Sequence, residues 1–161
     1  MNTKNEGLSS KISDKSRFFV IKSFSEEDVH KGIKYKVWCS TKHGNSLLNN
    51  AFYSTKEKGA DVFLFYSCNG SGRYVGVARL ASALDETNSF KYWTQDQKWA
   101  GLFDIEWVFL KDVPFKAFKG IDIKMKDGQI KPVTYSRDSQ EIPFSEGKRM
   151  LETIEIFTNS N

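Results

Sequence analysis

Apolar positions along the chain form two patterns that predict strands. A strand covered on both faces is a continuous apolar run, whereas a strand with one exposed face alternates apolar and polar residues. Six segments rich in β-branched and aromatic residues fit one of these patterns: 17–24, 60–68, 73–80, 103–110, 120–125 and 131–136. Asn69-Gly70 is a strong hairpin-turn sequence, so we expect the second and third of these segments to pair.

Apolar residues spaced three or four positions apart predict three helices. They are expected within 26–37, from Leu47 to about Gly59, and from Pro143 to Phe157. Ser25 and Asp28 resemble a capping box at the start of the first helix. Residues 38–45 and 85–99 are mostly polar and predict loops.

These elements indicate a mixed α/β domain. The strands do not alternate regularly with helices, which disfavours a doubly wound parallel sheet. We therefore expect a curved, barrel-like mixed sheet of about six strands with helices packed around it. The length of 161 residues suits one domain. Residues 1–16 are polar and predict a flexible arm, so the folded domain is expected to cover 17–158.

Charge and composition narrow the function only slightly. The formal net charge is +4, which suggests a polyanionic partner, although basic residues also keep proteins soluble. No apolar run approaches the length of a membrane span, and the N-terminus has no apolar signal segment. Cys39 and Cys68 are expected to be reduced thiols. Together with only two histidines they make no ordinary zinc set, so we expect no metal and no other cofactor.

Catalytic motifs are missing from the sequence. Gly70, Gly72 and Gly76 have a GxGxxxG spacing, but a strand rather than a helix follows, so the anion site of a phosphate loop is absent. Cys39 and His43 are near enough in sequence to be considered as a nucleophile pair. No third group at a recognisable spacing orients them. The sequence therefore gives no argument for an enzyme.

The tryptophans carry the strongest functional indication. One face of the segment 103–110 holds Phe103, Ile105, Trp107 and Phe109, which makes Trp107 a core residue. Trp38, Trp93 and Trp99 lie in polar segments instead. Each alone is readily explained as a core residue, but three together in a basic protein favour a pocket that stacks a base or holds a methylated group. Alanine at Trp38 or Trp93 is then expected to leave the fold intact, and alanine at Trp107 to destabilise it strongly.

Four long stretches of the sequence resemble one known family. They are SRFFVIKSFSEEDVHKGIKYKVWCSTKHGN, VFLFYSCNGSGRYVGVA, YWTQDQKWAGLFDIEWVFLKDVP and KPVTYSRDSQEIPFSEGKRML. Over about residues 16–155 they resemble the YTH domain, a reader of N6-methyladenosine in RNA. The likeness is to the cytoplasmic, DF-type branch and to the single YTH protein of budding yeasts. The resemblance implies a mixed, barrel-like sheet wrapped by helices.

The resemblance also implies roles for individual residues. A cage of three tryptophans around the methylated adenine would consist of Trp38, Trp93 and Trp99. Hydrogen bonding around the base would involve the backbone carbonyl of Cys39, Asp28 facing adenine N1, Phe24 in place of a common Tyr, and Asn69 at the pocket edge. The residues implied to contact the RNA backbone are Lys22, Arg137 and Asp138.

The chain departs from the family pattern near the third tryptophan. One extra residue separates Trp93 from Trp99, and Ala100 and Leu102 replace basic residues. Ordinary structural roles stay open for four of the implied site residues: a helix-start residue for Asp28, a hairpin residue for Asn69, an ion pair with Asp138 or Glu141 for Arg137, and a surface position for Lys22.

The function that the resemblance implies is a reader, not an enzyme. It would bind N6-methyladenosine in single-stranded mRNA as a monomer, with no preference for DNA and no membrane contact. It would link the mark to mRNA fate, such as stability or decay, with decay machinery engaged through regions outside this domain. The expected location is cytoplasmic, with nuclear presence left open. Two alternatives come from other classes: a module that binds a peptide in an aromatic groove, and an enzyme acting on modified RNA.

Overall fold

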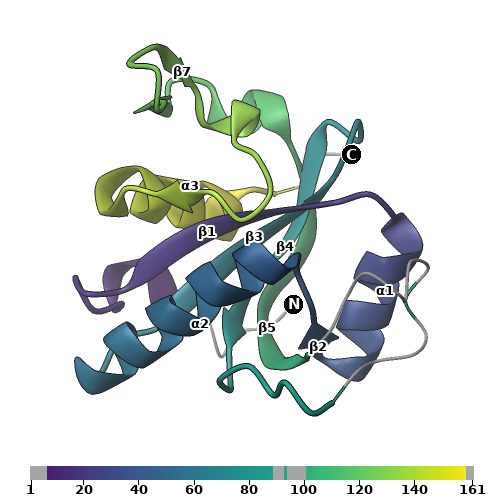
Figure 1. The fold of residues 1–161 in the computed structure, drawn as a ribbon. Coiled ribbons are helices and arrows are strands. Elements are labelled where there is room, and N and C mark those ends of the chain that lie inside the picture. Colours follow the sequence, from purple (N-terminus) through teal and green to yellow (C-terminus); the bar gives the residue numbers. More distant parts are fainter. Residues whose placement is uncertain (1–6, 89–92, 94–100, 159–161) are drawn as a thin grey trace.

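A curved mixed sheet of six strands organises the molecule (Figure 1). The computed structural model describes residues 7–88, 93 and 101–158. The sheet order is β2-β5-β4-β3-β1-β8, and β1 and β3 are parallel while the other neighbours are antiparallel. The strands are β1 Arg17–Ser23, β2 Val37–Trp38, β3 Val62–Cys68, β4 Arg73–Leu80, β5 Phe103–Pro114 and β8 Glu141–Ile142. The predicted fold class and the predicted hairpin at Asn69-Gly70 are confirmed.

Three α-helices pack on this sheet: α1 Glu26–Tyr35, α2 Lys42–Glu57 and α3 Phe144–Ile156. Ser25 caps α1 by accepting a hydrogen bond from the backbone N–H of Asp28, and Thr41 caps α2 in the same way. Because Thr41 supplies this cap, α2 begins inside the segment 38–45 that was predicted to be a loop. No helix in the described part of the chain is long and apolar enough to cross a membrane.

Each face of the sheet covers its own hydrophobic cluster. Helix α3 packs on one face through Met150 and Ile154, and α1 and α2 pack on the other. Successive side chains of a strand point to opposite faces, so Phe65 of β3 joins the α3 side and Tyr66 joins the α1–α2 side. This two-sided burial explains why β3 is a continuous apolar run.

A bulge in β5 moves Phe109 off the face that it was predicted to share with Phe103, Ile105 and Trp107. Val77 pairs with Phe109, whereas the next residue, Ala78, pairs with Trp107, so Val108 is an extra residue in the ladder. A bulge reverses the alternation of side chains beyond it. Phe109 therefore lies in the cluster on the α3 side, while Trp107 packs against the cluster on the α1–α2 side.

The segment 120–136 forms a small ribbon apart from the main sheet. It consists of β6 Asp122–Lys124 and β7 Ile130–Pro132, followed by a short 3-10 helix, η5, at Val133–Tyr135. The predicted strand over 131–136 is therefore wrong after Pro132. Ser136 donates to the carbonyl of Val133 from both its N–H and its hydroxyl, at 3.0 and 2.6 Å, and this closes a turn instead of extending a strand.

Residues 7–16, which the sequence assigns to a polar arm, contact the domain. Leu8 and Ile12 pack against the hydrophobic cluster on the α3 side. The backbone N–H groups of Gly7 and Ser9 donate to the Glu155 carboxylate at 2.6 and 3.0 Å. The few apolar residues of this segment are thus enough to attach it to α3.

Candidate nucleic-acid interface

The predicted base-binding residues gather at one edge of the sheet. β1 and β3 are parallel and in register, with Ser23 opposite Cys68, so both strands end at this edge. Asn69 follows β3 and donates its backbone N–H to the carbonyl of Ser23 at 2.8 Å. Phe24 follows β1, and α1 begins directly after it. The carboxyl ends of parallel strands are a common place for a ligand site.

Trp38 is placed beside this edge by the short strand β2. β2 pairs with β5, where Trp38 lies opposite Phe103. The ring also lies directly on α1: a Cβ atom added at Gly32 would be 3.1 Å from Cε3 of Trp38. Any larger residue at position 32 would therefore require the Trp38 ring to shift. The prediction that Trp38 opens a loop is wrong, because it belongs to the sheet.

Trp38 and Trp93, 55 residues apart, meet in a corner that we call the aromatic corner. Their ring centroids are 5.3 Å apart with an angle of 72° between the planes. Tyr66 stands behind Trp38 at 4.9 Å and 87°. At this distance and angle the two indole rings contact each other edge to face. Trp99, the third predicted cage residue, lies outside the described residues.

Both tryptophans of the aromatic corner are also core residues. Trp38 is 5% exposed and Trp93 is 6% exposed. Trp107, predicted to be the core tryptophan, is only partly buried, and its Nε1–H donates to the carbonyl of Gly32 at 3.1 Å. The expectation that Trp38 could be removed without cost to the fold therefore does not agree with its burial.

A hydrogen-bond network fixes the chain that leaves the aromatic corner. The amide of Asn45 bridges the two residues after Trp38: its Oδ1 accepts from the backbone N–H of Ser40 at 2.7 Å, and its Nδ2 donates to Sγ of Cys39 at 3.4 Å. Burial raises the pKa of the Cys39 thiol, which disfavours a thiolate nucleophile. With these partners, the considered Cys39–His43 pair receives no support.

Asp138 ties this segment to β1. Its carboxylate accepts the backbone N–H of Lys22 at 2.9 Å on one oxygen. The other oxygen is 3.5 Å from the hydroxyl of Ser40 and 3.4 Å from that of Ser139, and these two hydroxyls are 2.9 Å apart. Asp138 is exposed as a residue, but desolvation of its carboxylate raises its pKa despite the hydrogen bonds that lower it. Asp138, predicted to contact RNA, thus joins the aromatic corner to β1.

The two basic residues predicted to contact the RNA backbone differ in their surroundings. The ammonium of Lys22 donates to the carbonyl of Thr134 at 3.1 Å and lies 4.8 Å from the centroid of Phe115. Burial lowers the pKa of Lys22. Arg137 is exposed, and among the described residues no carboxylate forms an ion pair with it. Glu141, one of its considered partners, pairs with Arg17 at 2.7 Å. Arg137 is therefore the more available cation.

Three further predicted residues surround the start of α1. The side chain of Asp28 is buried in the first turn of this helix. Phe24 is 75% exposed, so it presents an aromatic ring beside the sheet edge. Asn69 is exposed and occupies the β3–β4 turn, as its hairpin role requires. The structure brings all three to the edge where β1 and β3 end.

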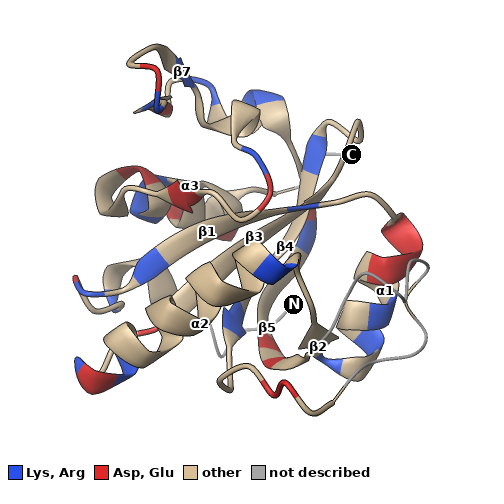
Figure 2. Ribbon diagram, viewed as in Figure 1, with Lys and Arg blue, Asp and Glu red and all other residues tan. Residues whose placement is uncertain are grey.

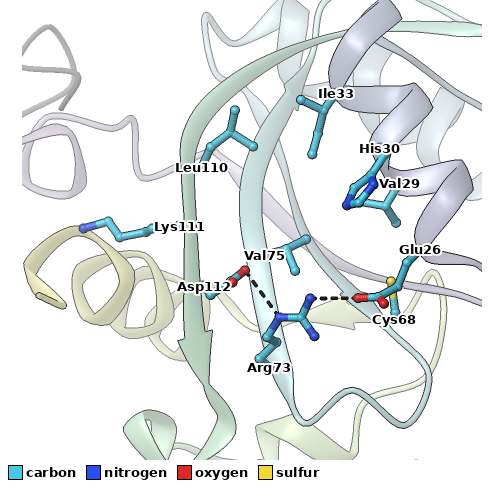
Figure 3. A pocket seen from close by; sticks show the side chains of 10 residues that line it. All are labelled: Glu26, Val29, His30, Ile33, Cys68, Arg73, Val75, Leu110, Lys111 and Asp112. Atoms are coloured by element: carbon cyan, nitrogen blue, oxygen red, sulfur yellow. Dashed lines mark hydrogen bonds and ion pairs between the residues drawn. The ribbon is translucent and has the colours of Figure 1, made fainter. Parts of the chain in front are cut away.

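A separate pocket of about 370 Å³ lies between α1 and the strands β4 and β5 (Figure 3). Val29 and Ile33 of α1 contribute apolar surface to it. Arg73 lies at one end and pairs with Glu26 at 2.7 Å and with Asp112 at 3.3 Å. Because these charges are already matched, the pocket offers no excess positive charge to RNA. In the described part of the chain no cluster of His, Cys, Asp and Glu side chains suits a metal ion.

Four further residues belong to this region without having been predicted from the sequence: Tyr66, Ser40, Asn45 and Ser139. Tyr66 lies two residues after Leu64 in β3, so both side chains point to the same face of the sheet. The alternation of the strand could therefore have placed Tyr66 on the α1–α2 side. Burial raises the pKa of Tyr66 well above its usual value, and the nearby Asp138 carboxylate adds to this. The three polar residues have no sequence pattern that marks them. Ser40 and Ser139 meet across 99 residues of chain, and the contacts of Asn45 depend on how the chain turns between β2 and α2.

The chain matches a family model over most of its length. The model of the YT521-B-like domain, abbreviated YTH, matches residues 16–155. YTH domain-containing family protein 1 of Mus musculus is 46% identical over 144 residues, which are 89% of this chain and 25% of that protein. YTH domain-containing family protein 2 of Homo sapiens is 45% identical over 144 residues, 89% of this chain and 24% of that protein. The chain thus spans about a quarter of the length of these curated relatives.

Solved structures agree with this match. The YTH domain of Pho92, solved in complex with m6A, has a TM-score of 0.83 and 38% identity, and the match covers 91% of this chain and 90% of that one. The YTH domain of the MRB1 protein of Zygosaccharomyces rouxii, in complex with N6-methyladenosine RNA, has a TM-score of 0.81 and 38% identity, covering 91% and 92%. The family match, the similarity to the DF-type proteins and the shared fold together show that this chain belongs to the YTH domain family.

Proposed function

We propose that this domain is a reader of N6-methyladenosine, which it binds in single-stranded RNA in a cage formed by Trp38, Trp93 and Trp99. The observation that carries the proposal is the aromatic corner, where Trp38 and Trp93 meet at 5.3 Å and 72°. The complexes of the related Pho92 and MRB1 domains with m6A and with N6-methyladenosine RNA support it. The domain acts by binding and not by catalysis.

Methyl recognition would combine one favourable and one unfavourable effect. N6-methyladenine is neutral, so the cage does not act through a cation. Burying the methyl group against indole rings is worth about 0.8 kcal/mol, and aromatic contact geometry adds roughly 0.5–1.5 kcal/mol. An unmethylated base would place a second N–H donor in the pocket without an acceptor, at a cost of about 1–3 kcal/mol. The methyl burial and the unpaired donor alone give a preference on the order of 2–4 kcal/mol.

The geometry after Trp38 suits the remaining hydrogen bond. In this proposal the backbone carbonyl of Cys39 accepts the single N6–H of the methylated base. Asn45 holds the residues on both sides of that carbonyl, through Cys39 Sγ and the Ser40 N–H. A carbonyl held in this way needs little reordering on binding. The methylated base must be unstacked, which single-stranded RNA permits.

In the cell, this binding would connect the methyl mark to the fate of cytoplasmic mRNA, such as its stability or decay. The chain spans about a quarter of its curated relatives, 24–25% of their length. In this proposal, contacts with decay machinery belong to regions outside this domain.

Titration of paired short RNAs, one with a single N6-methyladenosine and one unmethylated, tests the proposal. We expect the methylated RNA to bind about 30- to 1,000-fold more tightly at one stated salt concentration, as 2–4 kcal/mol implies. A DNA strand of the same sequence serves as control for the sugar. Equal affinity for the two RNAs would contradict the reader function and favour the peptide-binding alternative.

Arg137→Ala is expected to weaken binding to methylated and unmethylated RNA by a similar factor. Arg137 is exposed, and a phosphate contact carries no information about the base. The slope of log affinity against log salt should shrink by about 0.7, the value for one phosphate of a single strand. Arg149→Ala on α3 removes the same charge elsewhere and should leave the slope unchanged. An unchanged slope with lost methyl preference would place Arg137 in the base pocket instead.

Asp28→Asn is expected to tighten binding to methylated RNA by about two- to tenfold. Adenine N1 and an ionised carboxylate are both acceptors, whereas an asparagine amide donates an N–H and carries no negative charge. The cap of α1 survives, because Ser25 accepts from the backbone of Asp28 and not from its side chain. Glu27→Gln, an exposed neighbour, removes the same charge and should change affinity less than twofold. Isothermal titration that shows tenfold weaker binding of Asp28→Asn would assign the carboxylate an acceptor role.

A further inference from the structure

Tyr135 presents an aromatic ring to solvent next to a cation. Its side chain is 62% exposed, and Nζ of Lys131 lies 5.8 Å from the ring centroid. An exposed ring beside a lysine is the combination that single-strand binding proteins use, with the ring stacking a base and the cation holding a phosphate. The proposed methyladenosine cage makes no use of this ring.

The backbone under Tyr135 is held in place on both sides. Val133 is fully buried, and its N–H donates to the carbonyl of Ile121 at 2.9 Å. The hydroxyl of Ser136 donates to the carbonyl of Val133 at 2.6 Å. The carbonyl of Thr134 accepts from the Lys22 ammonium at 3.1 Å. A ring on such a fixed turn loses little freedom when a base stacks on it.

The same contacts connect this ring to the aromatic corner. Lys22, whose ammonium binds the residue before Tyr135, donates its backbone N–H to Asp138 at 2.9 Å. Asp138 in turn lies 3.5 Å from the hydroxyl of Ser40, two residues after Trp38. Tyr135 and Asp138 are three residues apart, a span of at most about 11 Å. Arg137 lies within that span. These contacts bring the aromatic corner and Tyr135 within reach of one short RNA strand.

The charge of this region also suits RNA. Residues 115–137 include five lysines, one arginine and two aspartates, an excess of four positive charges. This excess equals the formal net charge of the whole protein, +4. Figure 2 shows lysine and arginine positions on β7 and on the segment that leads from it toward β1. A concentrated positive surface attracts a polyanion and steers it to the site.

We propose that Tyr135 is a second nucleotide-binding position, where a base flanking the methylated adenosine stacks on the ring while Lys131 and Arg137 hold the adjoining phosphates. This inference rests on the proposed reader function. Stacking on a tyrosine ring is tolerant of base identity, so this position adds affinity for single-stranded RNA and leaves the preference for the methyl group unchanged.

The test combines protein variants with RNAs in which one flanking base at a time is replaced by an abasic nucleotide. Binding of a methylated nine-nucleotide RNA to the wild type should weaken about five- to tenfold at one flanking position. Tyr135→Ala should weaken binding of the intact RNA by a similar factor. In this variant the abasic substitution at that position should cause no further loss of affinity, because both changes remove the same contact. Tyr135→Phe keeps the ring and should stay within twofold of the wild type. Tyr53→Ala, which removes another exposed tyrosine, on α2, should have no effect.

Two outcomes separate this inference from the function on which it rests. The ratio of affinities for methylated and unmethylated RNA should be the same for Tyr135→Ala as for the wild type. If the wild type shows that preference but Tyr135→Ala binds the RNA as tightly as the wild type, Tyr135 does not stack a base. The same conclusion follows if the loss of affinity caused by Tyr135→Ala adds to the loss caused by every abasic substitution. If the wild type shows no preference, the reader function fails first.

Discussion

Trp38→Ala is expected to abolish the preference for methylated RNA and also to lower the free energy of unfolding by about 3–5 kcal/mol. Trp38 forms one side of the aromatic corner, and it is also buried between Gly32 of α1 and Tyr66 of β3. Its removal therefore takes away a wall of the cage and leaves a cavity. Urea unfolding measures the second effect, and titration at a temperature where the variant stays folded measures the first.

Trp107→Ala is the matched control for this variant. Trp107 also contacts Tyr66, at 4.7 Å between ring centroids, and is also bonded to Gly32, but it is not part of the aromatic corner. The Trp107→Ala protein should be less stable than the wild type and should retain the preference for methylated RNA. A folded Trp38→Ala protein that still prefers the methylated RNA would show that Trp38 is only a core residue.

Gly147→Ala in α3 is expected to destabilise the protein by about 1–3 kcal/mol, although alanine is the better helix former. A Cβ atom at this position would overlap the ring of Phe18 and lie 2.8 Å from its Cβ, which the backbone of β1 holds in place. The overlap should outweigh the gain of about 1 kcal/mol in helix propensity. Thermal unfolding measures the difference.

Ser145→Ala, at an exposed position of the same helix, controls for propensity and should change stability by less than about 0.5 kcal/mol. Because α3 covers the face of the sheet opposite the aromatic corner, Gly147→Ala should keep its methyl preference. A more stable Gly147→Ala protein would contradict the close approach of α3 to β1.

The long strands could be predicted because their patterns are local. The apolar run of β3 and the alternation at the start of β5 each extend over several residues. β2 and β8 have two residues each, too few for any pattern. The bulge at Val108 depends on pairing with β4 and has no local mark, so the predicted position of Phe109 was wrong.

The site could be predicted only as a set of residues and not as a geometry. Composition and the family resemblance pointed to Trp38 and Trp93, but their contact depends on pairing between β2 and β5. The network of Asp138 with Ser40 and Lys22 joins segments about a hundred residues apart. Such contacts arise from the topology of the sheet, which no single stretch of sequence encodes.

The most direct test of methyl recognition is a titration of the wild-type domain with three RNAs that differ at one base: adenine, N6-methyladenine and N6,N6-dimethyladenine. The monomethylated base has both a methyl group for the indole rings and one N–H for the Cys39 carbonyl. Adenine leaves a donor unpaired, and the dimethylated base has no N–H to donate. We expect the monomethylated RNA to bind most tightly, by tenfold or more over each of the others. Binding that rises steadily with the number of methyl groups would contradict the paired methyl and hydrogen-bond recognition.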